Sequence, residues 1–275
     1  MKRISILLFV LVFYAEGVLV AQEISKMKLF LLIGQSNMAG RGKIEMQDTV
    51  FYPGVLSLNK DLKWIPARDP IHFDKKEAGV GLGRTFGIEM QKYYHQMDTL
   101  ECFSVGLIPC AVGGTDIDKW QPGAYDANTN THPWDDMANR VTFARQNGEI
   151  VGILWLQGEG DSDPVRSKLY KDKLINLITR VRLHAGNKNI PFLCGELCRF
   201  FVKKQQKDGK YSAVQVIKTT KKIMQKGTNT AFVSSKGLID RGDKLHFDAK
   251  SCRELGHRYA IEYQNLMKHA LQNKN

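Results

Sequence analysis

The sequence of 275 residues lacks the features that divide a chain into separate parts. It has no linker rich in proline, serine and glycine, no internal repeat and no low-complexity tract, which excludes a modular or repeat architecture. It also lacks a phosphate-binding loop, a complete dinucleotide fingerprint and a recognisable group of metal ligands, so we expect no cofactor and no metal. The roughly 250 residues that follow an apolar N-terminal segment suit one α/β domain. We therefore predict a single domain over residues 22–275.

Cysteine is scarce and odd in number, which leaves at least one thiol unpaired in a monomer. The spacing of the cysteines matches no zinc site. We expect buried thiols. A local disulfide between Cys194 and Cys198, which are four residues apart, is the alternative. The five residues are Cys102, Cys110, Cys194, Cys198 and Cys252.

The first 21 residues have the pattern of a secretory signal. Lys2 and Arg3 precede an apolar stretch over residues 4–14, and residues 18–21 form a cleavage site before Gln22. The apolar stretch is short for a membrane span, and Glu16 interrupts its continuation. We predict a signal peptide over 1–21 and a secreted or periplasmic product with no stable membrane insertion after cleavage. Cleavage after Gly17 and an uncleaved anchor are the alternatives.

Positive charge dominates, with a formal net charge of +12 at pH 7. The lysines at 218, 221, 222 and 226 lie on a predicted helix, where a run of charge is usually a solvated face. No interleaved aromatic residues or nucleic-acid motif accompany them, so we predict no nucleic-acid partner. A basic rim would instead steer uronic or sialic acid substrates. The sequence makes no prediction about oligomeric state.

Strand-like and helix-like segments alternate along the chain, which predicts an α/β fold with a mainly parallel sheet covered by helices on both faces. The predicted strands are 28–33, 102–108, 150–156, 190–195 and 230–234, and the predicted helices are 83–95, 135–146, 167–184, 213–226 and 249–271.

Three polar motifs follow or lie near the ends of these strands. The apolar run 29–33 ends at Gly34-Gln35-Ser36-Asn37, the strand 150–156 ends at Gln157-Gly158-Glu159, and Asp243 precedes His246 by three residues after the last strand. Because the carboxyl ends of parallel strands meet at one edge of a sheet, these side chains are expected to converge. An unassisted serine is a weak nucleophile, so Ser36 needs His246 as its base, and Asp243 would orient that imidazole.

These motifs resemble those of SGNH-type carbohydrate acetylesterases, a group that includes the sialate O-acetylesterases and the acetylxylan esterases of carbohydrate esterase family six. The matching segments are 34–40, 79–83, 109–115, 155–159 and 243–247. The resemblance implies a three-layer, SGNH-hydrolase-like domain. The serine turn departs from Gly-x-Ser-x-Gly because Met38 occupies the second glycine position, so it is no α/β-hydrolase nucleophile elbow.

The resemblance also implies the remaining parts of the site. The oxyanion donors would be the backbone N–H of Ser36, the N–H of Gly81 (with Gly83 as the alternative) and the side-chain amide of Gln157, which stands where many relatives have asparagine. Supporting roles fall to Gln35, Asn37 and Glu159, with loop bracing favoured for Glu159. Thr115, Asp116 and Trp120 would border the sugar site, and Trp120 and Trp134 would either stack on sugar rings or lie buried.

The resulting hypothesis is a serine esterase that hydrolyses O-acetyl esters on carbohydrates through an acetyl-serine intermediate. Acetylated xylan, acetylated sialic acid and related glycans are the candidate substrates. A general short-acyl esterase and a catalytically weak, secreted glycan-binding protein are the alternatives.

Overall fold

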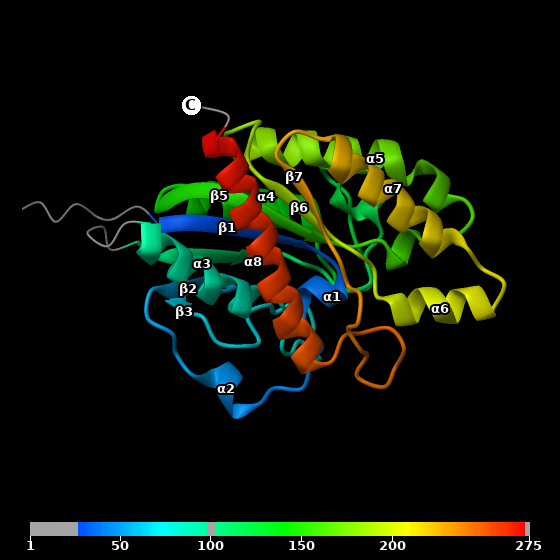
Figure 1. The fold of residues 1–275 in the computed structure, drawn as a ribbon, viewed down its shortest axis with the longest axis horizontal. Coiled ribbons are helices and arrows are strands. Elements are labelled where there is room, and N and C mark those ends of the chain that lie inside the picture. The colour runs from blue at the N-terminus through cyan, green and yellow to red at the C-terminus, as the bar shows by residue number, and fades with distance from the viewer. Residues whose placement is uncertain (1–26, 98–102, 273–275) are drawn as a thin grey trace, which may run out of the picture.

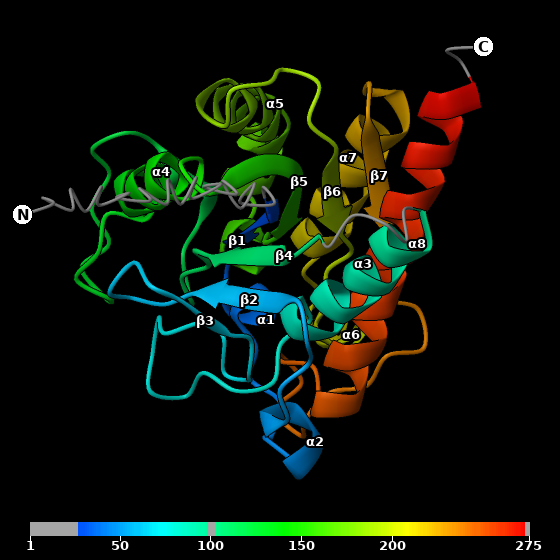
Figure 2. The ribbon, with the colours of Figure 1, turned by 90° about the vertical axis from the view of Figure 1, so that its left-hand side faces the viewer.

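The computed structural model describes residues 27–97 and 103–272. The predicted signal peptide and Cys102 lie outside these described residues. Figures 1 and 2 show a central sheet with helices packed on both of its faces.

The sheet has seven strands in the order β3-β2-β4-β1-β5-β6-β7. All neighbouring strands are parallel except β3, which pairs antiparallel with β2 at one edge. Apart from Lys28 and Glu149 near their starts, the long central strands β1 and β5 are apolar, as expected for strands that helices cover on both faces. The strand bounds are β1 Met27–Gly34, β2 Val55–Leu58, β3 Trp64–Pro66, β4 Val105–Pro109, β5 Gly148–Leu156, β6 Phe192–Gly195 and β7 Thr230–Val233.

Two hydrophobic cores form on the two faces of this sheet. Leu29, Leu31 and Ile33 of β1 face α4, α5 and α7, whereas Phe30 and Leu32 face α3 and α8. This alternation follows from the two-residue period of a strand. Figure 2 shows α3 and α8 together on one side of the sheet. The helix bounds are α1 Ser36–Ala39, α2 Met46–Thr49, α3 Gly83–Met97, α4 Pro133–Ala144, α5 Arg166–His184, α6 Arg199–Lys207, α7 Ser212–Lys226 and α8 Ala249–Gln272, with short 3₁₀ turns η1 Ile117–Trp120 and η2 Glu159–Asp161.

The predicted α/β class and the parallel sheet are confirmed, and each predicted strand and helix has a counterpart within a few residues. The structure adds the edge strand β3 and its neighbour β2, the short helices α1 and α2, and the helix α6. The cysteines at 110, 194, 198 and 252 are all free, so Cys194 and Cys198 form no local bridge.

The carboxyl edge of the sheet collects the polar motifs. Ser36 follows β1, the Gly113–Gly114 turn follows β4, Glu159 follows β5, and the loop with Asp243 and His246 follows β7. Gly34 lets β1 and β5 approach closely there, because a Cβ at this position would lie 2.1 Å from the carbonyl oxygen of Leu156. Segments separated by more than 200 residues therefore meet beside Ser36.

Candidate active site

Ser36 is the first residue of the short helix α1, directly beyond the end of β1. Its hydroxyl Oγ lies 3.0 Å from Nε2 of His246, a hydrogen-bonding distance. The serine is largely buried, at 7% exposure, yet it lines a cleft open to solvent. The structure thus brings the predicted nucleophile and the predicted base into contact.

Asp243 holds the other side of the imidazole. Its Oδ2 lies 2.7 Å from Nδ1 of His246, while its Oδ1 accepts the backbone N–H of His246 at 2.8 Å and that of Leu245 at 2.9 Å. The guanidinium of Arg241 donates to Oδ2 at 2.8 Å. One carboxylate therefore fixes both the ring and the backbone of the histidine.

These contacts set the protonation states of the pair. Burial acts to raise the pKa of Asp243, but the hydrogen bonds from His246, Arg241 and Leu245 outweigh it and hold this pKa well below its ordinary value. Partial burial lowers the pKa of His246; Asp243 opposes this shift, and the positive charges of Arg241 and Arg41 add to it. At neutral pH the site therefore holds a carboxylate beside a neutral imidazole, the state that a general base requires.

Asn37 braces the serine turn against two other segments. Its amide nitrogen donates to Oε1 of Glu159 at 2.6 Å and to the carbonyl of Leu245 at 3.1 Å, and its Oδ1 accepts the N–H of Phe247 at 3.2 Å. The residues on either side of His246 are therefore fastened to the residue next to Ser36. Gln35 makes a weaker link, because its Oε1 accepts the N–H groups of Gly158 and Gly160 at 3.4 and 3.3 Å.

Glu159 contacts Asn37, and its carboxylate is not hydrogen-bonded to His246. Burial raises the pKa of Glu159 above its ordinary value. Cys198, a residue with no predicted role, completes this group: its Sγ lies 3.0 Å from the amide nitrogen of Asn37 and 3.1 Å from the carbonyl of Leu245. These contacts match the bracing role favoured for Glu159 and leave the acid position to Asp243.

The cleft beside Ser36 has a volume of about 430 Å³. Charged side chains contribute much of its lining, among them Arg41, Lys75, Glu77, Glu159 and Arg241, with Phe201 from α6 and the Gly113–Gly114 turn completing it. Arg41 is almost fully buried and forms an ion pair with Asp74, the nitrogen and oxygen being 2.6 Å apart. Neither member of this pair stands out in the sequence, because isolated charged residues in loops carry no periodic signal.

The geometry does not support the oxyanion role predicted for Gln157. Its amide nitrogen already donates to Oδ2 of Asp161 at 2.6 Å and to the carbonyl of Thr115 at 3.1 Å, while its Oε1 accepts the hydroxyl of Tyr170 at 3.1 Å. Gln157 is 2% exposed and does not line the cleft. Both of its N–H groups are thus committed to joining the loops that follow β4 and β5.

Gly81 is also displaced from its predicted position. Its N–H points to Oδ1 of Asp69 at 3.5 Å, and its backbone packs against Gly40 outside the cleft lining. The alternative, Gly83, begins α3 among the apolar side chains of Leu32 and Ile71. Neither glycine faces Ser36, so the structure corrects this prediction.

A different glycine block occupies the place beside Ser36. A Cβ on Gly113 would lie 3.5 Å from the Cβ of Ser36, and both Gly113 and Gly114 line the cleft. The N–H of Gly113 donates to Oδ2 of Asp74 at 2.9 Å. The backbone N–H groups of Ser36 and Gly114 have no hydrogen-bond acceptor among the described residues. These two donors therefore have no partner in the described part of the chain, and both residues line the cleft. Ser36 belongs to the segment 34–40 and Gly114 to the segment 109–115, both of which carried the resemblance.

The aromatic residues predicted for a sugar site lie in the core instead. Trp120 is fully buried, packs edge-on against Trp155 and donates to Oγ1 of Thr115 at 3.3 Å. Trp134 is 6% exposed, and the guanidinium of Arg180 lies over its ring. The buried alternative is therefore correct for both tryptophans. Asp116 accepts the N–H of Asp118 at the start of η1 and does not line the cleft.

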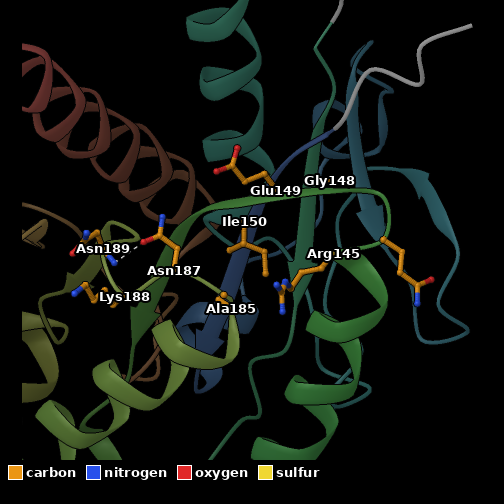
Figure 3. Close-up of a pocket in the computed structure, with 10 residues that line it drawn as sticks. Arg145, Gly148, Glu149, Ile150, Ala185, Asn187, Lys188 and Asn189 are labelled. Atoms are coloured by element: carbon orange, nitrogen blue, oxygen red, sulfur yellow. Dashed lines mark hydrogen bonds between the residues drawn. The ribbon is translucent and has the colours of Figure 1, made fainter.

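A larger hollow, of about 730 Å³, lies at the opposite edge of the sheet (Figure 3). Arg145 after α4, Glu149 and Ile150 at the start of β5, and Asn187–Asn189 after α5 surround it. Its lining includes no serine, histidine or cysteine. Size alone therefore does not identify the functional site, and the chemistry places it at the smaller cleft beside Ser36.

Two further properties concern the part of the chain that the structure describes. Within residues 27–97 and 103–272, no three His, Cys, Asp or Glu side chains are grouped as they would be around a metal ion. Over the same residues, no helix has both the length and the apolar character of a membrane span.

The chain is an α/β protein with an SGNH-hydrolase-like fold, and a hydrogen-bonded serine, histidine and aspartate lie at the carboxyl edge of its mainly parallel sheet. The chain belongs to the carbohydrate esterase family of sialic acid-specific acetylesterases, whose family model matches residues 26–265. It is accordingly a carboxylic ester hydrolase.

One sequence relative and one solved structure are each similar to most of this chain. A probable carbohydrate esterase of Arabidopsis thaliana is 29% identical over 255 residues, which cover 86% of this chain and 90% of the relative. A crystal structure of an Arabidopsis thaliana protein superposes with a TM-score of 0.73 at 28% identity, covering 87% of this chain and 98% of that one.

More distant structures share the fold. NanS superposes with a TM-score of 0.68 at 13% identity over 89% of this chain and 98% of its own. A carbohydrate acetylesterase of Xanthomonas citri gives a TM-score of 0.65 at 17% identity over 87% of this chain and 56% of its own.

Proposed function

We propose that this chain hydrolyses O-acetyl esters on carbohydrates through an acetyl-serine intermediate, with Ser36, His246 and Asp243 as its triad. The observation that carries the proposal is the unbroken contact from Ser36 Oγ to His246 Nε2 to Asp243 at the wall of an open cleft. Acetylated xylan, acetylated sialic acid or a related glycan is the substrate. The family description supports the acetyl group and the carbohydrate class.

The first half of the reaction acylates the serine. Ser36 Oγ attacks the ester carbonyl carbon while His246 Nε2 takes the hydroxyl proton. Asp243 stabilises the imidazolium that forms without accepting its proton. The bond between the tetrahedral carbon and the sugar oxygen then breaks; this oxygen takes the proton from His246 and leaves as the sugar hydroxyl, and acetyl-Ser36 remains.

The second half releases acetate. A water molecule attacks the acetyl carbonyl, and His246 takes its proton as before. Collapse of the second tetrahedral intermediate breaks the bond to Ser36 Oγ, which recovers its proton from His246. The products are acetate and the free triad.

Both steps place negative charge on the carbonyl oxygen, so donors must already point at it. We assign these donors to the backbone N–H groups of Ser36 and Gly114: both residues line the cleft, and neither N–H has an acceptor among the described residues. Gly114 has a φ of +89°, a left-handed conformation that favours glycine. This assignment replaces Gly81 and Gln157.

The test is acetate release from a panel of acetylated xylan, acetylated sialic acid and p-nitrophenyl esters of increasing acyl length. We expect release from an acetylated glycan, a preference for acetyl over longer acyl groups, and loss of nearly all turnover in Ser36→Ala with an unchanged melting temperature. A Ser36→Ala variant with wild-type turnover would exclude the covalent mechanism. Activity on short acyl esters alone would favour a general short-acyl esterase.

A further inference from the structure

A buried ion pair lies behind the glycine turn that faces Ser36. The Arg41 and Asp74 side chains are 5% and 1% exposed, and their closest nitrogen and oxygen are 2.6 Å apart. Oδ2 of Asp74 also accepts the N–H of Gly113 at 2.9 Å. The same carboxylate oxygen therefore joins the arginine to the turn that carries Gly114.

Arg41 connects this turn to the other two segments of the site. Its NH1 donates to the carbonyl of Gly40, at the end of the serine helix, at 2.7 Å. Its own carbonyl accepts NH1 of Arg241 at 3.0 Å, and Arg241 holds Asp243. The serine turn, the glycine turn and the loop that carries the triad acid thus all contact one arginine.

The packing leaves little room for the pair to move. A methyl group on Gly113 would lie 2.4 Å from NH2 of Arg41 and 2.8 Å from Oδ2 of Asp74, distances at which one group must shift. The pair and the turn are therefore in direct contact across the absent side chain of Gly113.

We propose that Arg41 and Asp74 are positioning residues whose ion pair fixes the Gly113–Gly114 turn against Ser36 and so holds the Gly114 N–H where the oxyanion forms. The inference rests on the proposed esterase function and adds to it the device that preorganises the donor. Neither side chain needs to touch the reacting atoms. Small displacements matter here because a misplacement of about 1 Å can cost about a hundredfold in rate.

The experiment compares Asp74→Asn with a matched control, Asp48→Asn. Asp48 is likewise 1% exposed and pairs with Arg253 at 2.7 Å, but it does not line the cleft. Both variants remove one charge from a buried pair and should lower the melting temperature. With p-nitrophenyl acetate, we expect kcat of folded Asp74→Asn to fall at least about tenfold with KM little changed, and that of Asp48→Asn to stay within about twofold of wild type.

A second readout follows the oxyanion directly. Phosphorylation of Ser36 by an organophosphate builds negative charge on the phosphoryl oxygen, so its rate should fall in Asp74→Asn and not in Asp48→Asn. If Asp74→Asn does not fold, Gly113→Ala serves instead, because its methyl group displaces the pair while both charges remain. That variant should show the same loss in kcat and in the phosphorylation rate.

The outcomes separate the two proposals. Wild-type kcat and phosphorylation rate in a folded Asp74→Asn or Gly113→Ala variant would overturn the positioning role while an inactive Ser36→Ala leaves the esterase mechanism standing. An equal loss of kcat in Asp48→Asn would also overturn it, because the effect would then be general destabilisation. An active Ser36→Ala would remove the proposed function itself.

Discussion

Asp243 and Glu159 both lie near the serine turn, but they face different partners. Oδ2 of Asp243 is hydrogen-bonded to Nδ1 of His246, whereas Oε1 of Glu159 accepts a hydrogen bond from the amide nitrogen of Asn37. We expect Asp243→Asn to lower kcat by about 10⁴-fold, because an amide holds the wrong tautomer of the imidazole. Glu159→Gln should cost much less, since it weakens a brace and leaves the triad whole. Steady-state kinetics of the two folded variants measure this order, and a larger loss in Glu159→Gln would move the acid role to that residue.

The lowered pKa of His246 predicts the pH dependence of the reaction. His246 must be neutral to take the proton of Ser36, so the rate falls as the pH drops through its pKa. Because this pKa lies below the ordinary value of 6.5, the acid limb of kcat/KM should have its midpoint below pH 6.5.

Arg241→Gln tests the cause of the lowered pKa of His246. It removes a positive charge that lowers the pKa of His246, so the midpoint should move to higher pH. Burial is the largest cause of the lowered pKa of His246; among the charged groups, Asp243 raises this pKa, and Arg241 and Arg41 both lower it. A wild-type midpoint at or above 6.5 would contradict the structure's account of the site.

At the scale of elements, Gln157 joins the end of β5 to its neighbours. It links η2 through Asp161, the loop after β4 through Thr115, and α5 through Tyr170. Gln157→Ala removes these bonds and leaves buried polar groups unpaired, which should reduce the free energy of unfolding by about 1–3 kcal/mol. Folded Gln157→Ala should keep most of its turnover.

Gln157→Glu sharpens the same prediction. A second carboxylate would face Asp161, whose pKa burial raises to about 6. We expect a lower melting temperature than in Gln157→Ala, with partial recovery as the pH falls and one carboxyl group takes a proton. Paired melting and turnover measurements test both variants, and a hundredfold loss of turnover at an unchanged melting temperature would return this amide to the oxyanion hole.

The elements that could be predicted are those with a sustained pattern. The apolar run of β1 and the 3.6-residue periodicity of α5, with Leu174, Leu177, Ile178 and Val181 all buried, have lengths that identify them. The strands β2 and β3 span only four and three residues, too few for a period to appear. Helix α6 has no buried residue and is rich in lysine, so its sequence is typical of a solvated basic segment and does not predict a helix.

The residues of the site also differ in how well the sequence predicts them. Ser36, Asp243 and His246 are neighbours of strand ends or of each other in the sequence, so local motifs found them. The donor that accompanies Ser36 could not be chosen from the sequence, because residues 79–83 and residues 113–114 both form glycine-rich turns. Which block faces Ser36 depends on strand order, which places β4 directly beside β1.

At the scale of the whole molecule, we propose that the folded domain is preceded by a removable signal. The basic start, the apolar stretch and the small residue before Gln22 support cleavage after residue 21. The intact mass of protein exported by a bacterial host should match a chain that begins at Gln22. A mass that retains residues 1–21 would indicate an uncleaved anchor.

The rate at which a thiol reagent labels Cys198 can measure local opening of the site. It is fully buried against Asn37 and the carbonyl of Leu245, and burial raises its pKa well above the ordinary value. A thiol reagent can therefore reach it only when the packing that covers it opens. The labelling rate of Cys198 then reports how often the packing around Asn37 and Leu245, the neighbours of Ser36 and His246, opens in the unmodified protein.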